Sequence, residues 1–261
     1  LLSRKANMIN QDMPSISGGV GEVYSDDNFS SYTLRSGFFR MNYSYADKYL
    51  LEVNGRYDGS SKFPTNSRFG LFPSVSAAWR ISQEPFMQGM EKVLSNLKLR
   101  CSYGTIGNQN ILPYKWLPGM SIRKAAWYLN GGYVYTLNTP GLVSSSFTWE
   151  KVKTLDLGLD ASFLQNRLNM TFDWYVRDPN GMLAEGSKKV LVTTAPWENT
   201  ANLRTKGWEL AVNYNGSISK DIDYTIGITL YDSKTKITKF DNVSGLLSQH
   251  YNGQYINEIW G

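Results

Sequence analysis

The chain has 261 residues, enough for one large domain or two ordinary ones, and its hydrophobic residues, 41% of the total, are diluted among polar residues instead of forming blocks. No apolar run of about eighteen residues occurs, which excludes a transmembrane helix but leaves a membrane β-barrel open. The formal net charge of +5 is modest and without a concentrated basic block, so the sequence predicts no nucleic-acid partner.

The two ends of the chain give a first expectation about its context. The opening residues, LLSRKANMINQDMPS, lack the basic, apolar and small-residue regions of a secretory signal peptide. The closing residues, EIWG, do not complete a strand pattern. We therefore expect a segment of a longer protein.

Alternation of apolar and polar residues begins near Phe38 and recurs along most of the chain. Strict alternation over four to eight residues predicts a strand with one wet face. A short helical turn is expected only between Ser82 and Leu94. The pattern therefore predicts an all-β fold of about eight strands in up-and-down order, at 38–45, 49–57, 69–79, 97–103, 154–163, 168–176, 208–214 and 224–230.

The connections between these strands alternate in length. Those at 46–48, 164–167 and 217–221 are short, whereas those at 104–150 and 177–206 far exceed the usual two to six residues. Short turns at one end and long loops at the other are typical of an antiparallel transmembrane β-barrel of the outer membrane, whose tight turns face the periplasm.

Aromatic residues fit this interpretation, because they fall at the expected heights of two membrane interfaces. If the tight turns face the periplasm, the sequence position of each outward residue gives its position along the membrane normal. Residues 69 to 79 make ten steps of about 3.3 Å, which a tilt of roughly 40 to 45° projects to about 24 Å, close to the height of a barrel's apolar band. The expected girdles are Tyr45, Tyr49, Trp79, Phe163, Tyr214 and Tyr224 at the periplasmic rim, and Tyr57, Phe69, Trp174 and Trp208 at the outer rim.

The opposite face of the same strands is polar. Unpaired charges in a dry core would cost several kcal/mol each, whereas a hydrated lumen avoids that cost. A closed barrel of eight strands leaves little room for such a lumen, so we expect one arc of a larger barrel. The residues expected to face the lumen are Glu52, Asn54, Arg56, Lys98, Arg100, Asp156, Asp160, Asn169, Asp173 and Glu209.

Three stretches, about two-thirds of the chain, resemble the C-terminal barrel half of the SusC/RagA family of TonB-linked outer-membrane transporters. They are RYDGSSKFPTNSRFGLFPSVSAAWRISQEPF, then LKLRCSYGTIGNQNI, then TWEKVKTLDLGLDASFLQNRLNMTFDWYVRD with NLRTKGWELAVNYN. The resemblance implies that residues 1–261 are part of one barrel domain of 22 strands, with plug and TonB-contacting regions outside this segment. It also implies a SusD-like surface lipoprotein as lid, the TonB complex as a partner, and import of oligosaccharides or peptides across the bacterial outer membrane.

The long connection at 104–150 is the expected ligand-binding region. Flat rings stack on apolar faces while amides pair with hydroxyls and carbonyls, a combination that suits sugars or peptide backbones. The alternative is that the rings form the loop's own core or contact the lipoprotein. The candidates are Trp116, Trp127, Tyr128, Tyr133 and Tyr135, with Asn108, Gln109, Asn110 and Asn130.

Other motifs carry less chemistry. The single His250 and single Cys101 leave little material for a zinc cluster or a Ser-His-Asp triad, and Asp156 and Asp160 lie about 13 Å apart on a strand, too far for glycosidase chemistry. The sequence therefore predicts no enzymatic activity, no catalytic or metal site and no cofactor. A calcium ion at Asp26, Asp27 and Asn28 is the one candidate, without EF-hand spacing.

Lysines at or beyond the outer strand ends would meet anionic lipopolysaccharide, with a solvated face as the alternative. These are Lys188, Lys189, Lys234, Lys236 and Lys239. Lipid is the expected neighbour of the apolar face.

Two rival architectures stay open from the residues alone. One is a small stand-alone outer-membrane barrel, acting as an adhesin or enzyme. The other is a soluble β-sandwich or carbohydrate-binding module, in which Leu51, Leu157 and Ile226 would contact apolar side chains of a second sheet.

Overall fold

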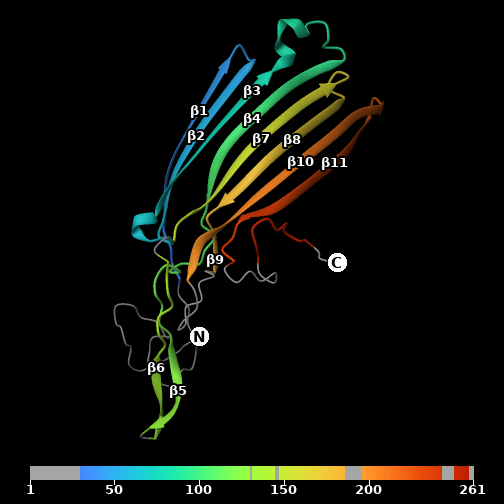
Figure 1. Cartoon of the computed structure of the whole chain (residues 1–261). Coiled ribbons are helices and arrows are strands. Elements are labelled where there is room, and N and C mark those ends of the chain that lie inside the picture. The colour runs from blue at the N-terminus through green and yellow to red at the C-terminus, as the bar shows by residue number, and fades with distance from the viewer. Residues whose placement is uncertain (1–29, 130, 145–146, 186–195, 243–249, 259–261) are drawn as a thin grey trace.

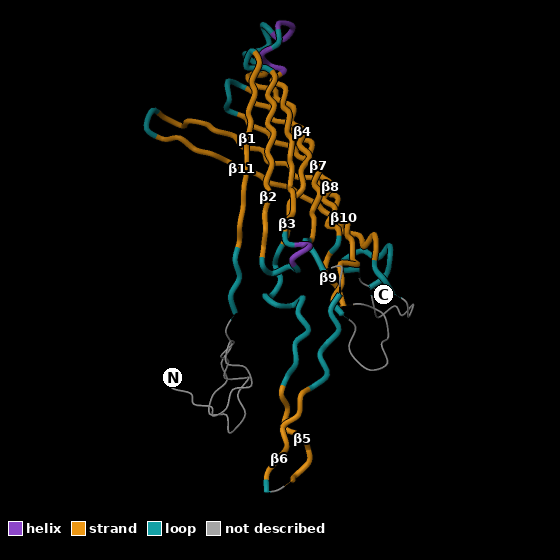
Figure 2. The backbone as a smooth tube through the Cα atoms, turned by 90° about the vertical axis from the view of Figure 1, so that its left-hand side faces the viewer, coloured by secondary structure: helices purple, strands orange, loops and turns teal. Residues whose placement is uncertain are grey.

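The structure is a computed structural model that describes residues 30–129, 131–144, 147–185, 196–242 and 250–258. Its main element is a nine-stranded sheet in the order β1-β2-β3-β4-β7-β8-β10-β11, with β9 paired to β10 and every pair antiparallel (Figures 1 and 2). A separate two-stranded sheet is formed by β5 and β6. The strands are β1 (Leu34–Tyr45), β2 (Tyr49–Ser60), β3 (Phe69–Arg80), β4 (Leu94–Asn108), β5 (Ile122–Leu129), β6 (Gly132–Leu137), β7 (Glu150–Phe163), β8 (Leu168–Asn180), β9 (Met182–Glu185), β10 (Trp197–Ser219) and β11 (Ile222–Lys239).

All eight strands predicted from the alternation are present, and consecutive ones are neighbours in the sheet. Their tight turns are confirmed too. The turns after β1 and β7 are built with positive φ at Ala46, Asp47 and at 164–166, conformations that suit a connection of three or four residues. The structure therefore confirms an all-β, up-and-down architecture and an arc of a larger barrel.

The outer end of the sheet differs from the prediction. The expected loop at 177–206 is wrong for most of its described residues, because β8 continues to Asn180, β9 covers Met182–Glu185 and β10 already begins at Trp197. The expected loop at 104–150 contains the β5–β6 hairpin, which extends away from the sheet (Figure 1). A 3-10 turn, η2 (Thr65–Ser67), was also unforeseen, whereas η3 (Ile81–Gln83) and η4 (Pro85–Met87) lie at the expected helical turn. No helix in the described ranges has the length and apolar character needed to cross a membrane.

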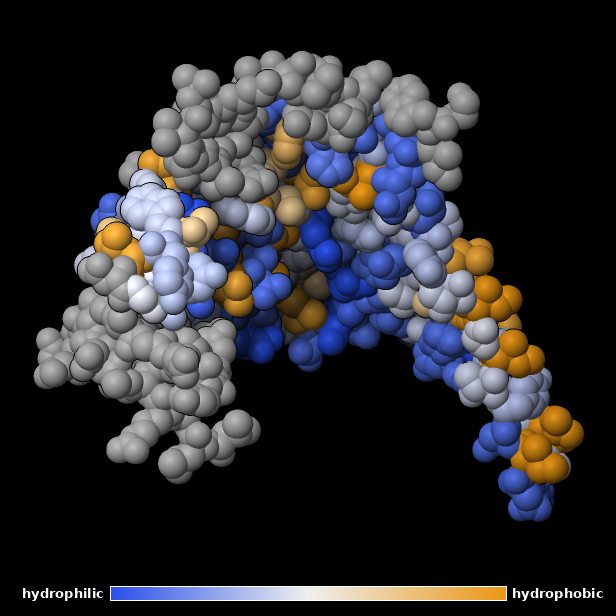
Figure 3. Space-filling model, turned by 90° about the horizontal axis from the view of Figure 1, so that it is seen from below, coloured by the Kyte–Doolittle hydropathy of each residue, from blue (hydrophilic) through white to orange (hydrophobic). Residues whose placement is uncertain are grey.

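The apolar face of the sheet is uncovered. Leu51, Leu157 and Ile226 are 39%, 43% and 60% exposed, so no second sheet packs on them within the described residues. Figure 3 shows the nine-stranded sheet, which we call the wall, as an arc. Hydrophilic side chains gather along its inside, and hydrophobic ones lie along the outer side of its right-hand arm. This arrangement contradicts the soluble-sandwich alternative.

The expected aromatic girdles are present on the uncovered face. At the end with tight turns, Tyr49 stacks between Tyr45 and Trp79, with ring centroids 6.4 Å apart in both pairs. At the other end, Tyr57 stacks on Phe69 at 5.2 Å. Trp174 and Trp208 lie directly opposite each other on β8 and β10.

The buried core lies at the outer end of the sheet, away from the middle of the wall. It consists of rings from two separate stretches, 63–72 and 147–149, with Ile111, Trp116 and Leu183 packed around them. Its buried members are Phe63, Phe72, Phe147 and Trp149.

Candidate functional site

The residues expected to face the lumen lie on the hydrophilic side of the wall, which we call the inner face. Their strongest cluster is centred on Arg100 of β4. Its guanidinium donates two hydrogen bonds to Asp160, both at 3.0 Å, and one to Asp173 at 2.8 Å. Lys98 completes the cluster with an ion pair of 2.8 Å to Asp160. These half-buried side chains satisfy one another across three strands, as charges on a partly enclosed wall require.

A glycine makes this cluster possible. Arg100 and Asp173 belong to β4 and β8, and Gly158 of β7 lies between them in register with both. A Cβ at position 158 would lie 2.6 Å from Arg100 Cζ and 2.5 Å from Asp173 Oδ1. The missing side chain therefore opens the path along which the guanidinium reaches across the intervening strand.

A second polar group occupies the inner face of β1 and β2. Arg40 pairs with Glu52, Asn54 donates to Glu52 at 2.8 Å, and Arg56 pairs with Asp58 at 2.7 Å. A hollow of about 930 Å³ lies against this part of the wall. Its polar lining includes Arg40, Glu52, Asn54, Arg56, Asp58 and Gln109.

The remaining inner-face candidates sit beside these groups. Asp156 lines a neighbouring hollow together with Glu52 and Arg100. Glu209 is exposed and lies opposite Asp173 in the register of β10 and β8. Asn169 accepts a 2.8 Å hydrogen bond from Ser162 near a tight turn. The structure thus brings Lys98, Arg100, Asp160 and Asp173 into one network and leaves Asp156 and Glu209 at its margin.

The loop candidates divide into two groups. Trp116 packs against the buried core, as the loop-core alternative expected, and its Nε1 is buried without a hydrogen-bond partner among the described residues. Asn108 and Gln109 lie where β4 leaves the wall, with Asn110 directly after them. Asn108 Nδ2 donates to Glu150 at 3.2 Å, while Gln109 Oε1 is buried with no hydrogen-bond partner in the described part of the chain.

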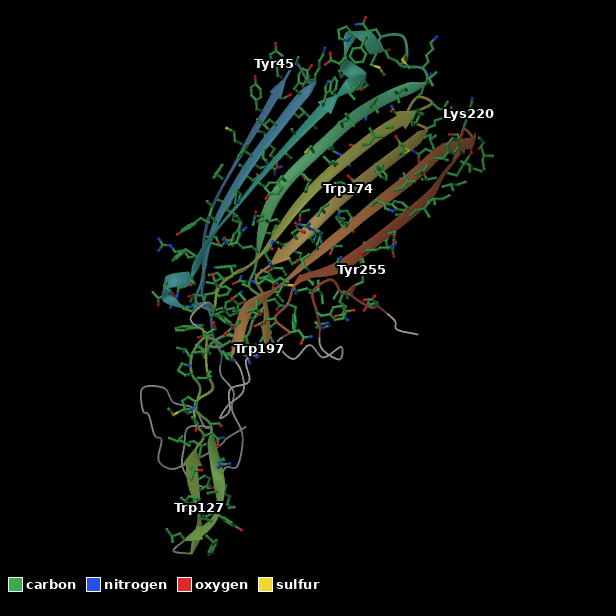
Figure 4. The ribbon with its side chains drawn as sticks, in the orientation of Figure 1. Tyr45, Trp127, Trp174, Trp197, Lys220 and Tyr255 are labelled. Atoms are coloured by element: carbon green, nitrogen blue, oxygen red, sulfur yellow. The ribbon has the colours of Figure 1, made fainter. Side chains whose placement is uncertain are left out.

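The other four rings lie on the β5–β6 hairpin, far from the wall (Figure 4, Trp127). Trp127 and Tyr128 are 69% and 65% exposed. Tyr133 packs edge-on against Tyr128 at 5.2 Å and lies under Lys124, whose Nζ is 4.2 Å from the ring centroid. Together with Tyr135 they give the hairpin an exposed aromatic surface.

The buried core joins the outer segments, and sequence reasoning missed it. Trp149 Nε1 donates to the Arg68 carbonyl at 2.8 Å, and its ring packs 4.8 Å from that of Phe63. Asn199 of β10 donates to the carbonyls of Thr148 and Gly181, and accepts from the Thr148 amide at 3.0 Å. One signal was available: Phe72 is a large ring on the polar parity of its strand.

A buried carboxylate organises the opposite, tight-turn end. Glu84, 9% exposed, accepts hydrogen bonds from the Tyr49 hydroxyl at 2.7 Å, from Trp79 Nε1 at 3.0 Å and from Lys48 Nζ at 3.1 Å. These donors favour the ionised form and hold the pKa of the Glu84 carboxyl below its usual range. The contact fastens the 81–93 connection to the girdle.

Within the described part of the chain, no cluster of three or more His, Cys, Asp or Glu side chains is placed to hold a metal ion. The calcium candidates Asp26, Asp27 and Asn28, like Asn130, Lys188 and Lys189, lie outside the described residues.

Comparison with known proteins gives consistent matches. The family model described as TonB dependent receptor-like, beta-barrel matches residues 4–258. TonB-dependent receptor P26 of Formosa agariphila is 35% identical over 217 residues, covering 83% of this chain and 22% of the relative. TonB-dependent receptor SusC of Bacteroides thetaiotaomicron is 34% identical over 213 residues, covering 79% and 21%.

Solved structures agree with these relatives. The RagAB peptide transporter superposes with a TM-score of 0.71 at 27% identity, covering 81% of this chain and 23% of that one. The RagAB peptide importer in its open-open state gives a TM-score of 0.75 at 25% identity, covering 90% and 25%. The chain therefore spans a quarter or less of the length of the proteins it matches.

Proposed function

The chain belongs to the TonB-dependent receptor β-barrel family, in its SusC/RagA group, and on that basis we propose that it forms wall and extracellular loops of an outer-membrane importer. The cargo is an oligosaccharide or a peptide, and a SusD-like surface lipoprotein acts as lid. Energy coupling to the TonB complex takes place through regions outside this chain. The role is transport, without a catalytic step.

One observation carries this proposal: the two faces of a single layer of strands have opposite chemistry. Leu157, 43% exposed, lies on a face of apolar side chains that nothing covers within the described residues. Its strand neighbours Asp156 and Gly158 lie on the face where Arg100, Asp160 and Asp173 pair. A wall between lipid and a wet enclosure requires this combination, because charges face water while apolar groups meet acyl chains.

Two features support a role in cargo capture. The hollow on the inner face offers amide, hydroxyl and charged groups from Asn54, Ser74 and Arg56, which suit polar cargo. The hairpin of β5 and β6 presents exposed rings outside the wall, which suit either cargo or a lipoprotein lid. RagAB, to which the chain is similar in structure, is a peptide transporter, and this likeness supports a peptide as cargo.

Uptake by whole cells tests the proposal. In a strain whose own copy of the complete gene is deleted, we expect lost growth on the oligosaccharide or peptide fraction that the gene supports, restored by the complete wild-type protein. A variant with residues 120–138 replaced by a short Gly-Ser connection should assemble, as judged by heat-modifiable migration of the barrel, but import poorly. Undiminished growth of the deletion strain on every such fraction would contradict the import function.

The same variant addresses the lid. If the hairpin contacts the lipoprotein, affinity purification of the complete protein should recover a surface lipoprotein with the wild type and less with the variant. Equal recovery of the lipoprotein with wild type and variant would show that the lid contacts another region, and the hairpin would then be expected to contact cargo.

A further inference from the structure

We propose that the outward face at the outer ends of β7, β10 and β11 binds the phosphate groups of lipopolysaccharide. This inference rests on the outer-membrane location proposed above and names one lipid and one site. We call the site the basic belt. Its six cations are Lys151, Lys153, Arg204, Lys206, Lys234 and Lys236.

Strand parity places these cations on the lipid side. On β7, Lys151 and Lys153 continue the parity of Leu155 and Leu157. On β10, Arg204 and Lys206 continue that of Trp208, and on β11, Lys234 and Lys236 continue that of Leu230. Because alternate residues of a strand share a face, all six project to the same side as the apolar residues.

Their height matches the headgroup layer. Trp174 and Trp208 mark the outer girdle and lie opposite each other. Lys206 is two residues further out, about 6.6 Å along the strand and about 5 Å along the membrane normal at the usual tilt. The side chains of Trp174, Arg204, Lys206, Trp208, Lys234 and Lys236 line one hollow of about 820 Å³. In Figure 4, Tyr255 of this hollow lies beyond Trp174, on the side away from Lys220.

The belt carries more positive charge than its neighbours neutralise. Lys206 lies directly opposite Lys234, and Arg204 directly opposite Lys236. Like charges in opposed positions destabilise a sheet, and a bound anion removes that cost. Arg204 alone is paired, with Asp178 at 2.7 and 2.9 Å. Within the described ranges the other five cations have no ion pair; Lys236 lies 5.7 Å from the Tyr255 ring centroid.

The acidic side chains on the same face are too few to compensate. Within the described residues, Asp178 on β8 and Asp232 on β11 share the parity of the belt, and Glu258 lines a hollow with Lys234; together they subtract three charges from six and leave three positive charges. At the other end of these strands, the outward positions are uncharged: Ala161, Phe163, Leu168, Tyr214 and Tyr224. The basicity is therefore confined to one interface, as expected for a leaflet rich in phosphorylated glycolipid.

The experiment measures lipid binding by the complete protein in dodecyl maltoside micelles, by native mass spectrometry. The probes are diphosphoryl lipid A, monophosphoryl lipid A and phosphatidylglycerol. The test variant is Lys206→Gln with Lys234→Gln, which removes one opposed pair. The matched control is Lys92→Gln with Lys220→Gln, which removes the same charge at the tight-turn end. Heat-modifiable migration verifies that both variants are folded.

We expect diphosphoryl lipid A to bind more tightly than the other two probes. The test variant should lose about a hundredfold in affinity, since it removes two charge-assisted hydrogen bonds that each contribute roughly a factor of ten, and the control should lose none. Equal affinity of wild type and test variant, or no preference over phosphatidylglycerol, would overturn the inference.

Failure of the belt is distinguishable from failure of the proposed location. Insertion into phosphatidylcholine vesicles is measured by quenching of tryptophan fluorescence with brominated lipid. If the protein inserts but shows no preference for lipid A, the proposed location stands and the lipopolysaccharide site is refuted. If it does not insert, both proposals are refuted.

Discussion

The two ends of the same strands are built differently. At the tight-turn end, two to four residues make the tight connections, and one carboxylate, Glu84, fastens the longer 81–93 connection to the girdle. At the outer end, two stretches far apart in sequence, 63–72 and 147–149, meet through Phe63, Phe72, Phe147 and Trp149. The first end is specified by local geometry, whereas the second depends on long-range packing.

This difference explains which parts of the molecule tolerate change. The wall is held by backbone ladders that any alternating sequence can form, so its side chains are free to differ between the lipid and lumen faces. The outer core is a small set of interlocked rings, where the loss of one ring leaves a cavity. Four substitutions test this contrast, from the largest expected effect to the smallest.

The largest effect is expected at the outer core. Trp149→Ala removes a ring that is 4% exposed and its hydrogen bond to Arg68, which should cost about 3 to 5 kcal/mol. Because the cost falls on the loops, hydrogen exchange should rise at the outer segments while the wall ladders stay protected. Trp127→Ala, at a ring 69% exposed, is the matched control and should change neither. Increased exchange throughout the wall would refute the separation of the two regions.

The second substitution tests the lipid face. Leu157→Arg puts a charge among acyl chains near mid-wall and should cost about 2 to 4 kcal/mol, measured by urea unfolding of the complete protein in phosphatidylcholine vesicles. Ser102→Arg is the control, because Ser102 lies opposite Asp156 on the inner face. Its effect should stay within about 0.5 kcal/mol. Similar costs for both variants would contradict the assignment of faces.

The third substitution tests the reach of Arg100. Gly158→Ala places a Cβ where the guanidinium lies and should cost about 1 to 3 kcal/mol through displacement of the ion pairs. The cost should shrink in an Arg100→Ala background, because the displaced group is then absent. If the costs of Gly158→Ala and Arg100→Ala were additive in this double-mutant cycle, the glycine would be required by the backbone and not by Arg100.

The wall could be predicted well from the sequence because a strand between lipid and water needs apolar and polar residues in regular alternation. Phe69 to Trp79 alternate without a break in the outward set, and the structure has β3 over Phe69–Arg80 with that set exposed. Charges on the other parity, such as Arg100 and Asp160, likewise fell on the inner face. Which charges pair could not be predicted, since pairing depends on the stagger between strands.

The outer end was predicted less well for a physical reason. Trp149 and Phe147 follow a long connection, and their burial depends on Phe63, more than eighty residues earlier. No local period marks such a contact. The β5–β6 hairpin was hidden too, because a strand pair free of the wall needs no lipid-facing parity. Whether its rings contact cargo stays a prediction.

The smallest effect is expected at Glu84, on the tight-turn end. Since the folded-state pKa of this carboxyl lies below its ordinary value of about 4.3, the ionised form stabilises the fold above that value, and the contribution is lost as pH falls through the folded-state pKa. Glu84→Gln keeps the shape but loses the charge, so it should be less stable than wild type at pH 7.

The difference between wild type and Glu84→Gln should narrow as the pH is lowered below 4, in urea titrations of the complete protein in vesicles. Glu91→Gln, an exposed carboxylate in the same connection, should show no such pH dependence. If the stability difference between wild type and Glu84→Gln persisted unchanged at low pH, the contribution of Glu84 would come from the shape of its side chain and not from its charge. Because Lys48, Tyr49 and Trp79 tie Glu84 to the β1–β2 turn, β2 and β3, loss of these contacts should loosen residues 81–93 and leave the outer core intact.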